Sequence, residues 1–434
     1  MVKAVYWAHF DPEAYWQPAS HIKLPTIAMS QTAIAIALLD ELYLPEADGD
    51  LALTLVRPDP ALSSYHQAIG LVPTRHWVFA NVGQWQKLGK PNWLALFAQA
   101  AAWQAEHSNI ADAFALLGQW PHRPYAYIEA IRNIPEFCDD LPQLNAVLNA
   151  NSKSYVTQLS QHLAIRCDGV LVETREDIEA VFELPLPFVI KEAFGVSGRG
   201  SIKIQQPEIA ERCKAYLLKQ CRQDTAGLVV QQWFEKELDF SSQWWIDKDG
   251  EVTLLGVCEI ANQGFKFVGV NPCRGALMKQ LEQGEYFSQL KQLLQSLHQQ
   301  GYYGPAGVDS MLLKDGSIYP VLEVNARQTM GNIALSWFAR FAHLPQLSFR
   351  QYDVQYVQPL DFEQLLQDLA QAGVLYEQNH PRGMIPLLSS NLQLELNKDS
   401  LRGRWAHLET PAVDGCDYVA VLNRALLRQG AKII

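Results

Sequence analysis

Two strand-like runs in the middle of the chain are joined by a loop that is rich in glycine. The runs are Phe188–Lys191 and Ser201–Ile204, and the loop between them contains Gly195, Gly198 and Gly200. Because glycine has no Cβ, the backbone N–H groups of such a loop can approach a polyphosphate closely. Lys191 would add a mobile positive charge for the same phosphates. The same pattern also fits an ordinary hairpin whose glycines supply positive φ angles.

A second segment, from Gly304 to Arg327, places acids inside a predicted hairpin. With a three-residue loop, Lys314 to Gly316, Leu313 pairs with Ser317 and Asp309 lies opposite Val321. Glu323 is then the diagonal neighbour of Asp309 on one face, with Cβ atoms about 7–8 Å apart. Asn325 and Arg327 share that parity. A two-residue loop would instead put the two carboxylates on opposite faces.

The acids of this hairpin suggest a metal site. Carboxylate and amide oxygens at that separation suit magnesium, which accepts a few protein ligands together with substrate phosphates. The alternative is an edge hairpin with solvated acids, in which Arg327 is a surface salt-bridge partner.

A third segment, Leu228–Glu237, is predicted as a buried strand that ends in amides, aromatic rings and an acid. An adenine ring needs an apolar slot with one or two hydrogen bonds at its edge, and a nearby carboxylate can accept from ribose hydroxyls. A strand that ends in Trp-Phe is also common in a plain hydrophobic core.

The order of these features resembles the ATP-grasp superfamily, from about Asn151 to about Ala342. The most specific matches are Phe188–Gly200 and Gly304–Arg327. The resemblance implies an α/β protein whose ATP-grasp part is α+β, with an N-terminal α/β pre-ATP-grasp domain and a C-terminal extension. The expected domains are residues 1–150, a small lobe at 151–240, a large lobe at 241–345 and an extension at 346–434.

The resemblance also implies roles for individual residues. Lys153 and Lys191 contact the phosphates, and the segment from Gly195 through Ser197 and Gly198 to Gly200 forms a flap over them. Gln231, Gln232 and Phe234 lie at the adenine and Glu237 at the ribose, although many relatives have an acid where Gln231 stands. Asp309, Glu323 and Asn325 match the magnesium ligands. Arg327 matches an arginine that steadies an acyl phosphate, and Arg327 and Lys191 are the expected catalytic residues.

The implied activity is that of an ATP-dependent ligase with ATP and Mg²⁺ as cofactors. It would activate a carboxylate as an acyl phosphate and join it to the amine of an amino acid or similar small molecule. The alternatives are activation of a non-carboxylate oxygen, a biotin-carboxylase-like reaction, and a nucleotide-binding regulatory module without catalysis. Dimers are common among such relatives, so a homodimer is a further expectation.

Composition supports a globular protein without a nucleic-acid or membrane partner. The 434 residues are 48% hydrophobic and 19% charged, and the formal net charge of −11 would repel phosphate backbones and anionic lipids. The 7 cysteines form no C-x-x-C pair, and the longest apolar run, Thr32–Leu39, is too short for a membrane span. A cytoplasmic location is therefore expected.

The first third of the chain alternates short apolar runs with helical stretches. Strands are predicted at 2–8, 51–56 and 77–80, and helices at 27–44 and 93–107.

Overall fold

The structure is a computed structural model of the chain. It describes residues 4–8, 10, 12–24, 38–43, 50–54, 57–71, 75–78, 122–128, 141–195, 200–221, 226–264, 266–344, 346–393, 401–412 and 415–434. Every helix among these residues is too short or too polar to span a bilayer.

A parallel sheet of four strands stands at the start of the chain. Its strand order is β3-β2-β1-β4, made of β1 (Val5–Trp7), β2 (Leu51–Thr54), β3 (Arg75–Val78) and β4 (His122–Pro124). A strand is present at each of the three predicted positions, although the third begins at Arg75, two residues earlier than predicted, and residues 2–3, 55–56 and 79–80 lie outside the described residues. Short helices α1 (Glu13–Trp16) and α3 (Pro60–Ala68) follow β1 and β2. Of the helix predicted at 27–44, only 38–43 is described, and Leu38–Leu42 forms a 3-10 helix; the helix predicted at 93–107 lies outside the described residues.

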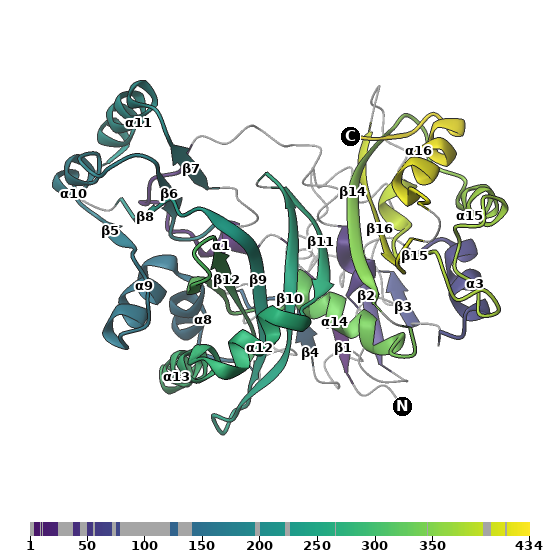
Figure 1. Cartoon of the computed structure of the whole chain (residues 1–434), viewed down its shortest axis with the longest axis horizontal. Helices are drawn as coiled ribbons and strands as arrows, with labels where there is room; N and C mark the ends of the chain where they lie inside the picture. Colours follow the sequence, from purple (N-terminus) through teal and green to yellow (C-terminus); the bar gives the residue numbers. More distant parts are fainter. Residues whose placement is uncertain are drawn as a thin grey trace, which may run out of the picture.

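A second sheet of four antiparallel strands carries the glycine-rich loop. Its order is β5-β8-β6-β7, made of β5 (Val170–Val172), β6 (Phe188–Glu192), β7 (Ser201–Ile204) and β8 (Leu228–Gln232). Helices α10 (Arg175–Val181) and α11 (Pro207–Gln220) lie beside it at the upper left of Figure 1. Ile190 and Val230 pack with residues of both helices in one apolar cluster. Because side chains alternate along a strand, Lys191 and Gln231 belong to the other face.

The third sheet has nine strands and runs through the middle of the molecule (Figure 1). Its main order is β13-β12-β9-β10-β11-β14-β16-β15, and β17 pairs with β14. The strands are β9 (Lys236–Ile246), β10 (Val252–Gln263), β11 (Lys266–Pro272), β12 (Gly304–Leu313), β13 (Ile318–Asn325), β14 (Ser348–Tyr356), β15 (Met384–Pro386), β16 (Leu401–Glu409) and β17 (Lys432–Ile433). The sheet therefore continues across residue 345, where the extension was expected to begin.

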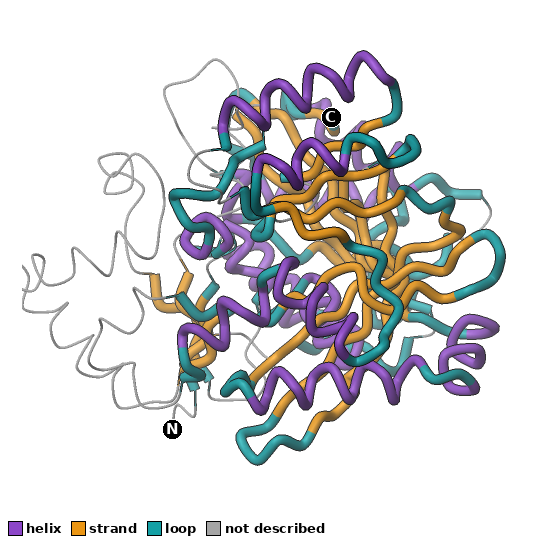
Figure 2. The backbone as a smooth tube through the Cα atoms, turned by 90° about the vertical axis from the view of Figure 1, so that its left-hand side faces the viewer, coloured by secondary structure: helices purple, strands orange, loops and turns teal. Residues whose placement is uncertain are grey.

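Helices pack on both faces of this sheet, and Figure 2 shows the backbone from the left-hand side of Figure 1. On one face, the Tyr286 hydroxyl of α13 (Tyr286–Gln299) bonds to Ser242 and Ser310 at 3.0 and 2.9 Å. On the opposite face, the thiol of Cys258 donates to the Gly331 carbonyl of α14 (Met330–Arg340) at 3.8 Å. The other α-helices in the described part of the chain are α8 (Leu144–Asn151), α9 (Lys153–His162), α12 (Gly275–Gln283), α15 (Phe362–Gln371) and α16 (Tyr418–Arg428). Asp309 on β12 and Ser241 on β9 are paired neighbours, and Ser241 also pairs with Cys258, so both lie on the α14 face.

Candidate active site

The hairpin of β12 and β13 has the predicted three-residue loop but a different register at its acids. The Leu313 N–H donates to the Ser317 carbonyl at 2.9 Å, as predicted. Beyond Met311 the register shifts, so that Asp309 pairs directly with Glu323 and not with Val321. The predicted diagonal arrangement of the two acids was therefore wrong.

Pro320 explains the shift. It has no N–H to continue the ladder, and its carbonyl instead accepts a hydrogen bond from the Ser310 hydroxyl at 2.7 Å. Pairing moves by two residues, which keeps both carboxylates on one face. Directly opposed carboxylates lie closer together than diagonal ones, so the pair depends more strongly on nearby cations.

Two lysines face this pair of acids. The Lys153 ammonium, at the start of α9, lies 3.0 Å from Glu323 and also donates to the Gly195 carbonyl at 3.1 Å. Ser152 caps the same helix by accepting from the Tyr155 N–H, which fixes where Lys153 leaves the backbone. Lys191, on β6, interacts with the charges of both acids. Burial lowers its pKa to about 8, with a further decrease from Lys153, while Glu323 and Asp309 act in the opposite direction.

The Asp309 carboxyl group has an unusual pKa. Burial and the charge of Glu323 raise its pKa to about 6, against the stabilising effects of the Ser241 hydroxyl and Arg327. An added cation would relieve this repulsion. The site thus combines two carboxylates and two ammonium groups from four separate elements.

The four-stranded sheet presents Gln231 on the same face as Lys191. Gln231 pairs with Val189, two residues before Lys191, so all three side chains share one face. The Gln231 side chain is buried, and its amide oxygen has no hydrogen-bond partner among the residues that the structure describes. Gln232 lies on the opposite face, and its amide donates to the Pro187 carbonyl at 2.9 Å. The structure therefore brings Gln231 into the site, but not the Gln232 side chain.

The other two residues predicted to bind the nucleoside, Phe234 and Glu237, do not lie on the sheet face that carries Lys191 and Gln231. The Phe234 ring stacks at a tilt on Tyr319, with 5.4 Å between centroids, in an apolar cluster with Met311 and Leu313. Glu237 is exposed at the start of β9.

The glycine-rich loop is described only at its two ends. Gly200 has a φ of +73°, and a Cβ there would lie 3.0 Å from the Glu192 carboxyl carbon, so this end of the loop requires glycine. Ser197 and Gly198 lie outside the described residues.

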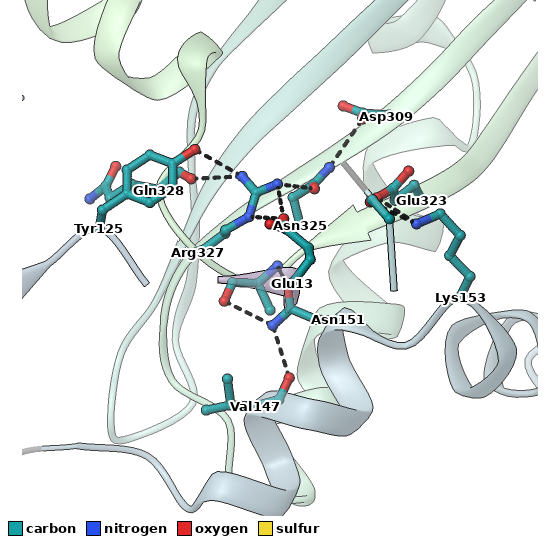
Figure 3. A network of polar contacts seen from close by, with 12 residues as sticks. Glu13, Tyr125, Val147, Asn151, Lys153, Asp309, Glu323, Asn325, Arg327 and Gln328 are labelled. Carbon is teal, nitrogen blue, oxygen red and sulfur yellow. Dashed lines mark hydrogen bonds and ion pairs between the residues drawn. The ribbon is translucent and has the colours of Figure 1, made fainter. Parts of the chain in front are cut away.

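Arg327 is the most highly connected side chain of the site (Figure 3). Its Nε and Nη2 atoms donate to one oxygen of Glu13, at 2.9 and 2.7 Å. Nη2 also donates to the Asn325 amide oxygen at 3.0 Å, while Nη1 donates to the Tyr125 hydroxyl at 3.0 Å and to the Gln328 carbonyl at 3.1 Å. Burial alone would lower the pKa of Arg327, but the Glu13 carboxylate raises it overall.

Sequence reasoning missed the residues that hold this network in place. Asn151 accepts from the Ala326 N–H at 2.9 Å and thereby fixes the backbone between Asn325 and Arg327. Glu13 and Tyr125 come from the N-terminal sheet unit, far from Arg327 in the sequence, and no local pattern marks them. Thr329 caps α14 by accepting from the Asn332 N–H at 3.1 Å. A threonine just before an apolar run is a recognised start signal, so Thr329 could have been found.

A buried polar chain connects Asp309 to this helix. The Ser241 hydroxyl bonds to Asp309 and accepts from the Gln243 amide at 2.8 Å. The Gln243 amide oxygen in turn accepts from the Thr329 hydroxyl. Gly331 makes room for Gln243, because a Cβ there would lie 2.7 Å from the Gln243 side-chain nitrogen.

A Gly331→Ala variant tests this packing. The added methyl group should displace the Gln243 side chain and leave buried polar groups unpaired, at a cost of about 1–3 kcal/mol. Chemical denaturation should show the loss of stability. A Gly284→Ala variant is a suitable control, because a Cβ at Gly284 meets only the Gln280 carbonyl, at 3.2 Å. Equal stability of the two variants would contradict the proposed packing.

The donor set fits magnesium. Asp309, Glu323 and Asn325 offer only oxygen donors, and the amide nitrogen of Asn325 already donates to Asp309 at 3.0 Å. The described residues contain no group of three or more His, Cys, Asp or Glu side chains able to hold a metal ion. A magnesium ion at these residues would thus depend on further oxygens from substrate phosphates.

Comparison with known proteins gives one curated relative, and no family model matches the chain. A segment of 144 residues is 33% identical to the [butirosin acyl-carrier protein]–L-glutamate ligase of Niallia circulans, covering 32% of this chain and 33% of that ligase. The match thus spans about a third of the curated relative.

Solved structures resemble almost the whole chain. Biotin carboxylase of Campylobacter jejuni has a TM-score of 0.55 at 12% identity, covering 100% of this chain and 93% of its own. The biotin carboxylase domain of Hydrogenobacter thermophilus 2-oxoglutarate carboxylase has a TM-score of 0.53 at 14% identity, covering 100% and 91%. N5-carboxyaminoimidazole synthetase of Staphylococcus aureus, solved with ADP, has a TM-score of 0.51 at 12% identity, covering 95% of each chain. These proteins share one architecture, and the chain therefore has the ATP-grasp fold.

Proposed function

We propose that the protein is an ATP-dependent ligase that activates a carboxylate as an acyl phosphate and joins it to an amine. One observation carries this proposal. Lys153 forms an ion pair with Glu323 at 3.0 Å, and Lys191, on the four-stranded antiparallel sheet, interacts with the charges of Glu323 and Asp309 on the nine-stranded sheet. The substrate carboxylate would attack the γ-phosphorus of ATP and release ADP. The amine would then attack the acyl carbon, release phosphate and form the amide bond.

The side chains of the site suit this reaction because both steps involve crowded negative charge. Lys153 and Lys191 would neutralise the triphosphate and the migrating phosphoryl group. Asp309, Glu323 and Asn325 would hold magnesium, which when bound neutralises phosphate oxygens and aligns them for transfer. The segment between Gly195 and Gly200 would cover the phosphates and exclude water, which would otherwise hydrolyse the acyl phosphate.

Gln231 and Phe234 supply the adenine end of the proposed site. The unpartnered Gln231 amide oxygen can accept from the exocyclic amino group of adenine, and the cluster around Phe234 offers an apolar surface. Glu237 is the proposed ribose contact, and Ser197 and Gly198 are proposed flap residues. We also propose that the two ATP-grasp lobes comprise residues 151–240 and 241–345. The protein would act as a homodimer, and its location would be the cytoplasm.

A second acceptor class is favoured by one observation. The curated relative is named for joining L-glutamate to an acyl-carrier protein, at 33% identity over 144 residues. The same acyl phosphate could therefore pass to a nucleophile that a carrier protein bears. The activation half of the reaction would be unchanged.

Phosphate release from ATP and magnesium tests the proposal, across acids and amines supplied singly and in pairs. Release that requires an acid together with an amine supports the ligase. Release with an acid and a carrier protein, but not with free amines, supports the second acceptor class. Tight ATP binding without release under any condition would identify a regulatory module and contradict the proposal.

Replacement of Gln231 by Leu tests the adenine assignment separately. The variant loses the amide oxygen at the adenine edge, so the dissociation constant of ATP should rise about tenfold. Isothermal titration with ATP measures the change, and Gln232→Leu is the matched control because its side chain lies on the other face. Equal losses in both variants would contradict the assignment of Gln231.

A further inference from the structure

The two carboxylate oxygens of Glu13 differ in their hydrogen bonds. One oxygen, Oε1, accepts two hydrogen bonds from Arg327, at 2.9 and 2.7 Å. The other oxygen, Oε2, is buried and has no partner among the residues that the structure describes. The side chains of Glu13 and Arg327 are 9% and 6% exposed. A buried carboxylate oxygen without a donor is costly, so this atom requires an explanation.

Arg327 itself has no donor left for a ligand. A guanidinium group carries five N–H bonds, and the contacts to Glu13, Asn325, Tyr125 and Gln328 use all of them. Releasing Arg327 from Glu13 would break a buried ion pair, which is strongly unfavourable. Arg327 therefore orients the Glu13 side chain. Within this ion pair, the atom that can still bind a ligand is Glu13 Oε2.

Glu13 is close to the residues proposed to hold magnesium. Arg327 Nη2 bridges Glu13 Oε1 and the Asn325 amide oxygen, and the Asn325 amide nitrogen donates to Asp309. Figure 3 shows this sequence of contacts, with Glu13 next to Arg327 and Asn325. Glu13 is thus linked through Arg327 and Asn325 to Asp309, at the edge of the proposed reaction site.

We propose that Glu13 Oε2 binds a protonated primary amine of the substrate. The inference rests on the proposed ligase function and names one chemical group that the substrates carry. A carboxylate oxygen can only accept, so its ligand must be a donor. An ammonium group would add an ion pair to the hydrogen bond, and hydrogen bonds with an ionised partner are about twice as strong as those between neutral groups. The amine could belong to the acid that is activated or to the molecule that attacks it. In the second case the ammonium group must first lose a proton, which the Glu13 carboxylate would accept, so that the neutral amine can attack the acyl carbon.

Matched pairs of acids distinguish these two sources. L-Glutamate and glutarate differ only in the amino group, as do L-aspartate and succinate. With hydroxylamine as the common nucleophile, hydroxamate formation measures activation of each acid by the full chain. In a second arm, one activated acid is kept constant, and a primary amine is compared with hydroxylamine as the nucleophile.

Glu13→Gln is the informative variant. The glutamine oxygen can still accept from Arg327, but its NH₂ group replaces Oε2 and presents a donor to the ammonium group. We expect kcat/KM for the amino-bearing compound to fall about 10- to 100-fold, with its counterpart changed far less. Tyr125→Phe is the control, because it removes another Arg327 contact and leaves Glu13 intact. Its ratio of kcat/KM within each pair should match that of the wild type.

Three outcomes would overturn the proposal. Equal losses for both members of every pair would show that Glu13 only holds Arg327. A lower KM for the acids in Glu13→Gln would show that Glu13 occupies the place of the substrate carboxylate. If no compound supports turnover, the proposed ligase function itself fails. Thermal shift with the non-hydrolysable ATP analogue AMP-PNP, magnesium and L-glutamate then tests whether Glu13 binds an ammonium group. A shift that is equal in the wild type and in Glu13→Gln would then exclude ammonium binding at Glu13.

Discussion

A Glu323→Gln variant is expected to lose at least about 10²- to 10³-fold in ATP-dependent turnover and to remain folded. Glu323 has two roles in the site. It is a proposed magnesium ligand, and it forms an ion pair with the Lys153 ammonium at 3.0 Å. The amide removes the negative charge that both roles require, although its shape is nearly the same. The transferring phosphoryl group would then lack correctly placed cations.

Steady-state release of ADP and phosphate measures the loss, and far-UV circular dichroism and thermal melting verify the fold. Glu235→Gln is the matched control, because Glu235 pairs with Lys314 on an exposed surface, with side chains 71% and 66% exposed. Such surface pairs contribute about 0–1 kcal/mol, so this variant should behave as the wild type. Full turnover of Glu323→Gln would contradict the metal assignment. A variant that fails to melt cooperatively would show instead that Glu323 is needed for folding.

Local sequence patterns predicted most of the elements around the proposed phosphate site. The β6–β7 pair, helix α9 and the β12–β13 hairpin were expected from strand patterns, glycines and turn residues, and all are present. These features depend on neighbours within a few residues. Lys191, Asp309 and Glu323 became candidates for the same reason, since each lies at a recognisable place in such an element, whereas Lys153 was implied by the resemblance to the ATP-grasp superfamily.

The parts that sequence reasoning did not predict depend on contacts between distant segments. The register at Asp309 was wrong because Pro320 breaks the ladder inside the strand, which the loop length does not reveal. Glu13 and Tyr125 reach Arg327 only because the N-terminal sheet unit packs against the end of β13. The strands β9, β11, β14 and β16 were also missed, although β11 and β14 pair with each other across the expected domain boundary at residue 345.

The rate with MgATP is expected to follow a bell-shaped pH profile, with limbs near the pKa values of Asp309 and Lys191. Burial and Glu323 raise the pKa of Asp309 to about 6, so its carboxylate becomes available for a metal ion only above that pH. Burial lowers the pKa of Lys191 to about 8, so its charge, which phosphate binding requires, is lost as the pH rises through 8. The kcat/KM for MgATP should therefore rise through about pH 6 and fall through about pH 8, since this parameter reports groups of the free enzyme.

Lys191→Arg identifies the group behind the alkaline limb. Arginine remains charged over the whole range, so the variant should keep the acidic limb and lose the fall near pH 8, although a guanidinium group places its charge differently and lowers the maximum. A profile for MgATP that still falls near pH 8 in this variant would assign the alkaline limb to another group. Saturating ATP gives a second measure, because kcat reports the bound state. The negative triphosphate stabilises the ammonium form of Lys191, so the alkaline limb in kcat should move to higher pH than in kcat/KM.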